Sequence, residues 1–164
     1  MENRARFLFE VLDEVLRYVP ANRVGLRLSP KAVKEGMADS QPEITYGWII
    51  RQLNAYELAY IHLSEMMTPD ERLAGKPESI VPLYRDIYHG TLVSCGGHSR
   101  ESAIRMLDAN QADLIAFGKP FISNPDLVER LKADIPLAEP DKETFYHGGP
   151  KGYVDYPAAE GSRE

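Results

Sequence analysis

The sequence predicts an α/β fold in which about four parallel βα units form half of a (β/α)8 barrel. Short apolar runs alternate with segments of helical periodicity along the chain, a pattern typical of parallel strands joined by right-handed crossovers. Two consecutive apolar runs, at residues 91–94 and 114–117, are followed by glycine turns and then by helical segments. Barrels commonly hold a phosphate group in the loops after their last two strands, so these turns predict the phosphate-binding end of a barrel.

The first part of the chain is expected to form a helix, a strand, a second helix and a second strand. Apolar residues recur at helical spacing over residues 7–19, and Pro20 marks the end of that helix. The residues that follow predict a strand at 24–28, a helix at 44–54 and a strand at 58–63. Polar, Pro- and Gly-containing segments predict loops at residues 31–43 and 64–77.

The second part is expected to repeat this alternation. A third helix covers residues 80–88, and Pro82 must lie in its first turn because proline lacks a backbone N–H. Asn124 and Pro125 have the residue types of a helix cap and a first helical position, so a last helix is expected to begin there. Between them we expect a strand at 91–94, a helix at 99–109 and a strand at 114–117.

These elements predict a half-barrel domain over residues 1–135 and a Pro-, Gly- and Tyr-rich tail over residues 136–164 that lies against the barrel or frays. A closed barrel of this kind needs eight strands, whereas four leave two unpaired edges and an interior face open to water. The sequence therefore predicts either instability or association, through self-association or with a complementary half-barrel.

Composition restricts the class of protein. The 164 residues carry a formal net charge of −6, and 43% of them are hydrophobic. The negative charge argues against nucleic-acid and anionic-membrane partners, and no apolar run approaches the length of a membrane span. The single cysteine, Cys95, excludes an internal disulfide and suits a reducing compartment, so a cytoplasmic location is expected.

The candidate phosphate ligands are four residues of the two glycine turns. Glycine lets backbone N–H groups approach an anion closely, and a neighbouring lysine adds positive charge. One such turn alone is weak support, since strand–helix turns use glycine routinely, but two on successive strands strengthen the interpretation. The four residues are Gly96, Gly97, Gly118 and Lys119.

Arg27 is a second candidate, because it interrupts an apolar strand where an unpaired charge would be costly. It either contacts an anionic or electron-rich cofactor at the barrel mouth or is a structural arginine with a protein partner. His62 is more consistent with a core histidine than with a ligand. The histidines have no metal-ligand spacing to each other or to Cys95, so no metal site is expected.

Several segments together resemble the old yellow enzyme family, the FMN-dependent NAD(P)H ene-reductases built on a TIM barrel. They are spread over nearly the whole chain, and their combination is far more specific than any single piece. Within the family the chain looks most like the branch of plant oxophytodienoate reductases and bacterial ene-reductases. The matching segments are residues 2–7, 24–30, 112–131, 145–146 and 152–157.

The resemblance implies a flavin site. It implies that Arg27 contacts the flavin ring where negative charge grows on reduction, and that Gly96, Gly97, Gly118 and Lys119 hold the FMN phosphate. The family usually has arginine or another polar residue at the position of Lys119, and lysine keeps the charge but loses the bidentate fork. Phe121 is implied to border the flavin, and Tyr146 to lie near the substrate rim.

The first residues resemble the helix after the family's fourth strand. The histidine pair or His-Asn pair that anchors substrate, and the tyrosine that donates a proton, would precede them, so we assign no catalytic residue to this chain. One hypothesis is an FMN- and NAD(P)H-dependent reductase of enones or nitro-alkenes whose chain is truncated or split. The alternative is a non-catalytic half-barrel remnant that self-associates or binds FMN weakly. A non-flavin phosphate-sugar half-barrel is a third, less favoured hypothesis.

Overall fold

The computed structural model describes residues 1–30, 39–65 and 79–159. The chain forms two compact units, Met1–Ala116 and Phe117–Glu164. The domain boundary after residue 135 that the sequence suggests stays a prediction. Most of the two expected loops, residues 31–38 and 66–78, lies outside the described residues.

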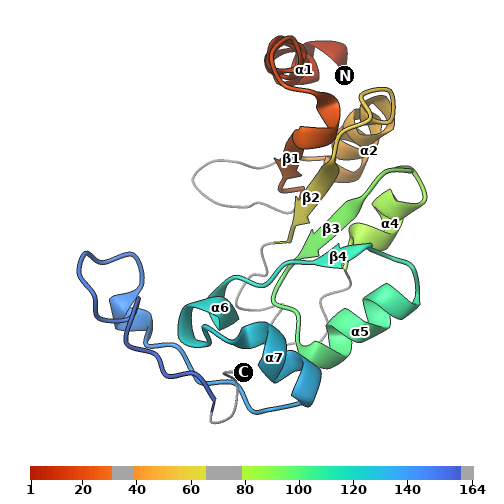
Figure 1. Ribbon diagram of the computed structural model, residues 1–164. Coiled ribbons are helices and arrows are strands. Elements are labelled where there is room, and N and C mark those ends of the chain that lie inside the picture. The colour runs from red at the N-terminus through yellow and green to blue at the C-terminus, as the bar shows by residue number, and fades with distance from the viewer. Residues whose placement is uncertain (31–38, 66–78, 160–164) are drawn as a thin grey trace. The chain divides into compact units, whose positions relative to one another are not determined.

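The first unit contains a four-stranded sheet in the order β1-β2-β3-β4, and every pairing is parallel (Figure 1). The expected α/β architecture with four parallel strands is therefore confirmed. The last strand is two residues long, shorter than expected. The strands are β1 Gly25–Leu28, β2 Tyr60–Ser64, β3 Leu92–Cys95 and β4 Leu114–Ile115.

Helices connect these strands in the order that the apolar periodicity predicts. Pro82 lies in the first turn of α4, where its missing N–H costs no helical hydrogen bond. Ser99 caps α5 by accepting a hydrogen bond from the backbone N–H of Ser102. The elements are α1 Glu2–Leu16, η1 Ala21–Arg23, α2 Pro42–Leu53, α4 Val81–Arg85 and α5 Arg100–Asp108.

The two faces of the sheet have different surroundings. One face carries buried aliphatic residues, among them Ile61, Leu63 and Leu92 at 0% exposure, which pack in one core with residues of α1, α2, α4 and α5. Figure 1 shows α2, α4 and α5 on one side of this sheet. Burying each such side chain contributes about 1.5–3 kcal/mol, so this face holds the unit together.

The opposite face, called the open face below, carries side chains that are half-buried or exposed, apart from the buried Ser64 at the end of β2. In the register of the sheet, Arg27 lies beside His62, His62 beside Val93, and Val93 beside Leu114. Tyr60 and Leu114 expose 40% and 54% of their surface. Among the described residues, the buried Nε2 atom of His62 has no hydrogen-bond partner. The open face therefore combines exposed apolar surface with an unsatisfied polar atom.

The second unit contains two short helices, α6 Lys119–Ser123 and α7 Leu127–Ala133, and the 3₁₀ turn η2 Lys142–Thr144. The prediction that a helix begins at Asn124 and Pro125 is wrong. Asn124 ends α6, and its side-chain amide exchanges two hydrogen bonds with the backbone of Ala138. The side chain of Asn124 thus binds the backbone of a residue 14 positions later in the chain instead of capping a helix. The sequence periodicity also did not predict the five-residue helix α6.

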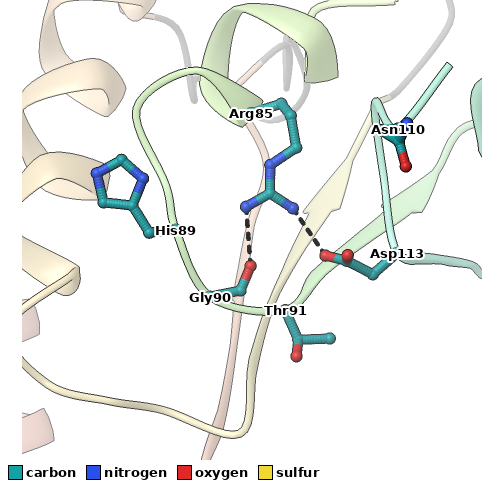
Figure 2. A pocket seen from close by; sticks show the side chains of 6 residues that line it. All are labelled: Arg85, His89, Gly90, Thr91, Asn110 and Asp113. Atoms are coloured by element: carbon teal, nitrogen blue, oxygen red, sulfur yellow. Dashed lines mark hydrogen bonds and ion pairs between the residues drawn. The ribbon is translucent and has the colours of Figure 1, made fainter.

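A hollow at the amino-terminal ends of β3 and β4 is organised by an ion pair (Figure 2). Arg85 Nη1 lies 2.7 Å from Asp113 Oδ2, and Arg85 Nη2 donates to the carbonyl oxygens of Tyr88 and Gly90. The same Asp113 oxygen accepts the backbone N–H of Leu92 at 2.7 Å. Arg85 is therefore engaged with the protein itself, and we assign this hollow a structural role in holding the start of β3.

We expect Asp113→Ala to lower the free energy of unfolding by about 1–2 kcal/mol, because Arg85 loses its ion-pair partner and the N–H of Leu92 loses its acceptor. Urea denaturation followed by circular dichroism measures this change. Glu10→Ala, which removes an exposed carboxylate from α1, is the control and should stay within about 0.5 kcal/mol of the unmodified chain. Equal effects of the two substitutions would show that the Arg85–Asp113 pair contributes nothing.

A second prediction concerns pH. Burial lowers the pKa of His62 below 6.5, and the charge of Arg27 acts in the same direction. The unfolded chain then takes up the proton first as the pH falls through about 6.5, so stability is full above that pH and decreases below it. Burial also lowers the pKa of His98, against an opposing effect of Glu65, so two histidines contribute to the slope.

His62→Gln should make the loss of stability between about pH 7.5 and pH 5.5 less steep, since one of these two groups is removed. Urea midpoints at several pH values give the slope. His147→Gln replaces an exposed histidine and should leave the slope as it is. A slope that His62→Gln does not reduce would contradict the prediction.

Candidate phosphate and cofactor site

The carboxyl-terminal ends of parallel strands meet at one edge of a sheet, which is where α/β proteins usually bind ligands. Glu65 directly follows β2 at this edge. Its backbone N–H donates to the carbonyl oxygen of Cys95 at 2.7 Å. Its carboxylate accepts hydrogen bonds from Ser79 Oγ at 2.8 Å and from the backbone N–H of Ile80 at 2.6 Å. Glu65 thus ties the ends of two strands to the start of α4.

The turn formed by Gly96 and Gly97 lies directly beyond β3 and needs glycine at both positions. A Cβ atom on Gly96 would come within 2.9 Å of the Cβ atom of Glu65, too close for any other residue without a local shift. Gly97 has a φ of 68°, in the left-handed region that favours glycine. Gly96 is buried, whereas Gly97 is exposed. The turn therefore presents backbone near the start of α5, where helix N–H groups attract anions.

His98 follows this turn and contacts residues on both sides of it. One of its ring nitrogens, Nε2, lies 2.9 Å from the hydroxyl of Ser94, a residue of β3 with 0% exposure. The other, Nδ1, lies 3.5 Å from the hydroxyl of Ser102 in α5. Burial lowers the pKa of His98, which favours the neutral ring that can serve both hydroxyls. His98 thus connects the strand before the turn to the helix after it.

Arg27 lies on the open face, at the third position of β1, and is exposed. Its Nη2 atom donates to Ser64 Oγ at 2.9 Å. Ser64 ends β2 and is 5% exposed. The guanidinium is therefore held by a protein partner while it remains accessible. This geometry is compatible both with a structural arginine and with an arginine that contacts a cofactor.

The remaining candidates belong to the second unit. Gly118 is the N-cap of α6 and Lys119 its first residue, and both are exposed. Phe121 in the same helix is 47% exposed. Tyr146 is 88% exposed and has a φ of 60°, which is unusual for a residue with a bulky side chain. Such backbone conformations persist where the surrounding structure holds them, often at functional sites.

Sequence reasoning did not single out Glu65 or His98 as parts of the turn. The signals were present, since Glu65 directly follows an expected strand and His98 directly follows the glycine pair. Their roles depend on contacts with residues of neighbouring elements, which residue spacing does not reveal.

Within residues 1–30, 39–65 and 79–159, no group of three or more histidine, cysteine or carboxylate side chains could hold a metal ion. No described helix is long and apolar enough to span a bilayer.

Comparison with known proteins connects this geometry to a family. The family model described as "NADH:flavin oxidoreductase / NADH oxidase family" matches residues 1–138. The chain is 40% identical over 167 residues to "Putative 12-oxophytodienoate reductase 3" of Oryza sativa subsp. japonica, covering all of this chain and 44% of that protein. It is 37% identical over 163 residues to "12-oxophytodienoate reductase 2" of Arabidopsis thaliana, covering 98% and 43%.

Solved structures agree with the sequence relatives. Morphinone reductase in complex with tetrahydroNAD superposes with a TM-score of 0.86 at 40% identity, covering 99% of this chain and 43% of that one. The old yellow enzyme of Trypanosoma cruzi gives a TM-score of 0.84 at 34% identity, covering 94% and 40%. The chain thus spans less than half the length of these relatives, as expected for part of a (β/α)8 barrel.

The family model covers most of the chain, and the relatives exceed 30% identity over nearly all of it. The resemblance drawn from the sequence is therefore confirmed, and the cofactor of this family is FMN. The chain belongs to the NADH:flavin oxidoreductase / NADH oxidase family, together with the old yellow enzymes and the 12-oxophytodienoate reductases.

Proposed function

We propose that this chain is the flavin-phosphate part of an FMN-dependent reductase that uses NAD(P)H to reduce activated alkenes such as enones and nitro-alkenes. The observation that carries the proposal is the Gly96–Gly97 turn, which Glu65 and His98 hold at the carboxyl-terminal end of β3. When bound, FMN supplies the redox chemistry that links oxidation of the nicotinamide to reduction of the alkene.

The residues of the first unit fit a phosphate monoester. Gly97 is exposed with a positive φ, and the nine-residue helix α5 begins three residues later, so backbone N–H groups and the helix dipole favour an anion there. Gly118 and Lys119 are proposed as further phosphate ligands on the resemblance alone. Lys119 would act as a point charge rather than as a bidentate fork.

Arg27 is proposed to favour the reduced flavin. A fixed cation beside developing negative charge stabilises that charge without reorganisation at the moment of reaction. The hydrogen bond to Ser64 supports this role, because it limits the positions that the guanidinium can take. Phe121 and Tyr146 are proposed to border the flavin and the substrate.

The open face supports a proposal about the partner. In the described sheet, β1 and β4 each pair on one side only, and unpaired edges invite pairing with another chain. The exposed side chains of Tyr60 and Leu114 would be covered by a complementary half-barrel with the remaining four strands. The substrate-anchoring and proton-donating residues would come from that half. Self-association through the open face is the alternative.

The first experiment adds FMN to the purified chain, removes free flavin by gel filtration, and records the visible spectrum beside a light-scattering mass. A retained and perturbed flavin band supports the proposal. A folded chain that retains no flavin overturns it and favours a non-catalytic half-barrel. A dimeric mass would identify self-association as the means by which the open face is covered.

Lys119→Ala should weaken FMN binding by about 1–3 kcal/mol, the scale of a lost charge-assisted hydrogen bond. Flavin fluorescence titration measures the affinity. Lys132→Ala, which removes an exposed lysine from α7, is the matched control and should bind FMN as the unmodified chain does. Unchanged affinity in Lys119→Ala would remove this lysine from the site.

Arg27→Ala should lower the midpoint potential of bound flavin. A lost interaction of about 1.4 kcal/mol corresponds to about 30 mV for a two-electron couple, which potentiometric titration resolves. Ser64→Ala is the control, because it removes the hydrogen bond and keeps the charge, so its shift should be smaller. An unshifted potential in Arg27→Ala would leave this residue a structural arginine.

A further inference from the structure

One arginine of the second unit holds both ends of the segment between residues 136 and 157. Arg130 Nη1 donates to the carbonyl oxygen of Pro136 at 2.8 Å. Arg130 Nη2 donates to the carbonyl oxygen of Pro157 at 3.3 Å. These two carbonyl groups are the points at which the segment leaves α7 and returns to it, so a single guanidinium closes it into a loop. We call residues 136–157 the tail loop.

Asp126 completes this closure. Arg130 Nε donates to Asp126 Oδ1 at 2.8 Å, and each side chain is only 9% exposed. Asp126 Oδ2 accepts the backbone N–H of Ala159 at 2.7 Å, beyond the returning end of the loop. Both charges are therefore buried and hydrogen-bonded to each other and to backbone groups, so that removal of either side chain would be costly.

The tail loop carries Tyr146 between these fixed ends. The backbone N–H of Asp141 donates to the hydroxyl of Tyr156 at 2.8 Å, a second link between the two arms. Thr144 Oγ1 donates to the carbonyl oxygen of Asp141 at 2.8 Å, which shapes the turn before Tyr146. The ring of Phe145 meets that of Tyr146 edge to face, with centroids 6.2 Å apart. Tyr146 is thus a highly exposed side chain on a constrained backbone.

We propose that Asp126 and Arg130 are positioning residues that close the tail loop and thereby fix the position of Tyr146. Closing a long loop costs chain entropy, and the buried pair offsets this cost by binding both ends at once. Arginine suits the role because its planar fork presents several donors in fixed directions, whereas lysine is a point charge. The closure of the loop stands on the contacts described here. The identity of the molecule that Tyr146 would contact, an enone or nitro-alkene, rests on the proposed function.

The simpler alternative is that the pair stabilises only α7, since the two residues are four positions apart on the chain. That role would lower the melting temperature and leave the folded tail loop as tightly held as before. Cleavage of the folded chain within the loop separates the two roles. Lys142 and Lys151 provide trypsin sites there, and the side chain of Lys151 is 79% exposed.

The experiment digests the full chain with trypsin well below its melting temperature and measures cleavage after Lys142 and Lys151 by mass spectrometry. Arg130→Lys keeps the charge and loses the fork, and we expect cleavage at these two sites to become about tenfold faster. Arg105→Lys makes the same exchange at an exposed position of α5 and should digest like the unmodified chain. Cleavage of a folded Arg130→Lys variant at the unmodified rate would overturn the proposal.

A second variant and a measurement on the unmodified chain cover the case in which Arg130→Lys does not fold. Asp126→Asn keeps the shape of the side chain and removes its charge, and it should also accelerate loop cleavage, with Glu129→Gln as the exposed control on the same helix. In the unmodified chain, the amide of Ala159 should exchange slowly with solvent deuterium because it donates to a buried carboxylate. Rapid exchange there would contradict the proposed closure.

The position of Tyr146 can be followed without flavin or substrate. Trp48 is the only tryptophan, so Tyr146→Trp in a Trp48→Phe background gives a fluorophore at the loop tip alone. Adding Arg130→Lys should increase the amplitude of the fast component in the fluorescence anisotropy decay of this tryptophan. An unchanged amplitude would mean that Asp126 and Arg130 do not position residue 146. A chain that shows this loosening but binds no FMN would refute the proposed function and leave the positioning role intact.

Discussion

Parallel pairing of four short strands, with α2, α4 and α5 packed on one face, is the constraint on which the rest of the described first unit depends. Every second side chain of β1–β3 packs into the helical core, and the alternate side chains are left on the open face. Parallel sheets normally have both faces covered, because their exposed edges and apolar faces are costly in water. The fold thus places Arg27 and the glycine turn on this sheet, and the partner proposed above would cover the open face.

The same constraint places polar residues where they can serve a ligand. Glu65 directly follows β2. Its carboxylate caps the start of α4, and its backbone N–H binds the end of β3. This contact explains why Gly96 has no room for a side chain. A glycine that resembles a pure phosphate-binding feature in the sequence therefore has a packing role as well, and the two roles favour the same residue.

The second unit is organised differently, because polar contacts rather than an apolar sheet hold its chain. Asn124, Asp126 and Arg130 are buried, and they bind backbone groups of the segment that follows α7. Buried polar side chains are tolerated when they are satisfied in this way. These contacts hold the described part of the tail to α7, and Tyr146 lies within it.

The sequence by itself determined the α/β class, the order of the four strand–helix units and the family, because hydrophobic periodicity, proline and glycine act locally and the family segments are distributed along the chain. It also indicated Arg27 and the Gly96–Gly97 turn. Only the tertiary structure decided the roles of Glu65, His98 and Arg130 and the true function of Asn124. Their hydrogen bonds reach across elements or many residues along the chain, and such long-range pairings leave no periodic signal in a sequence.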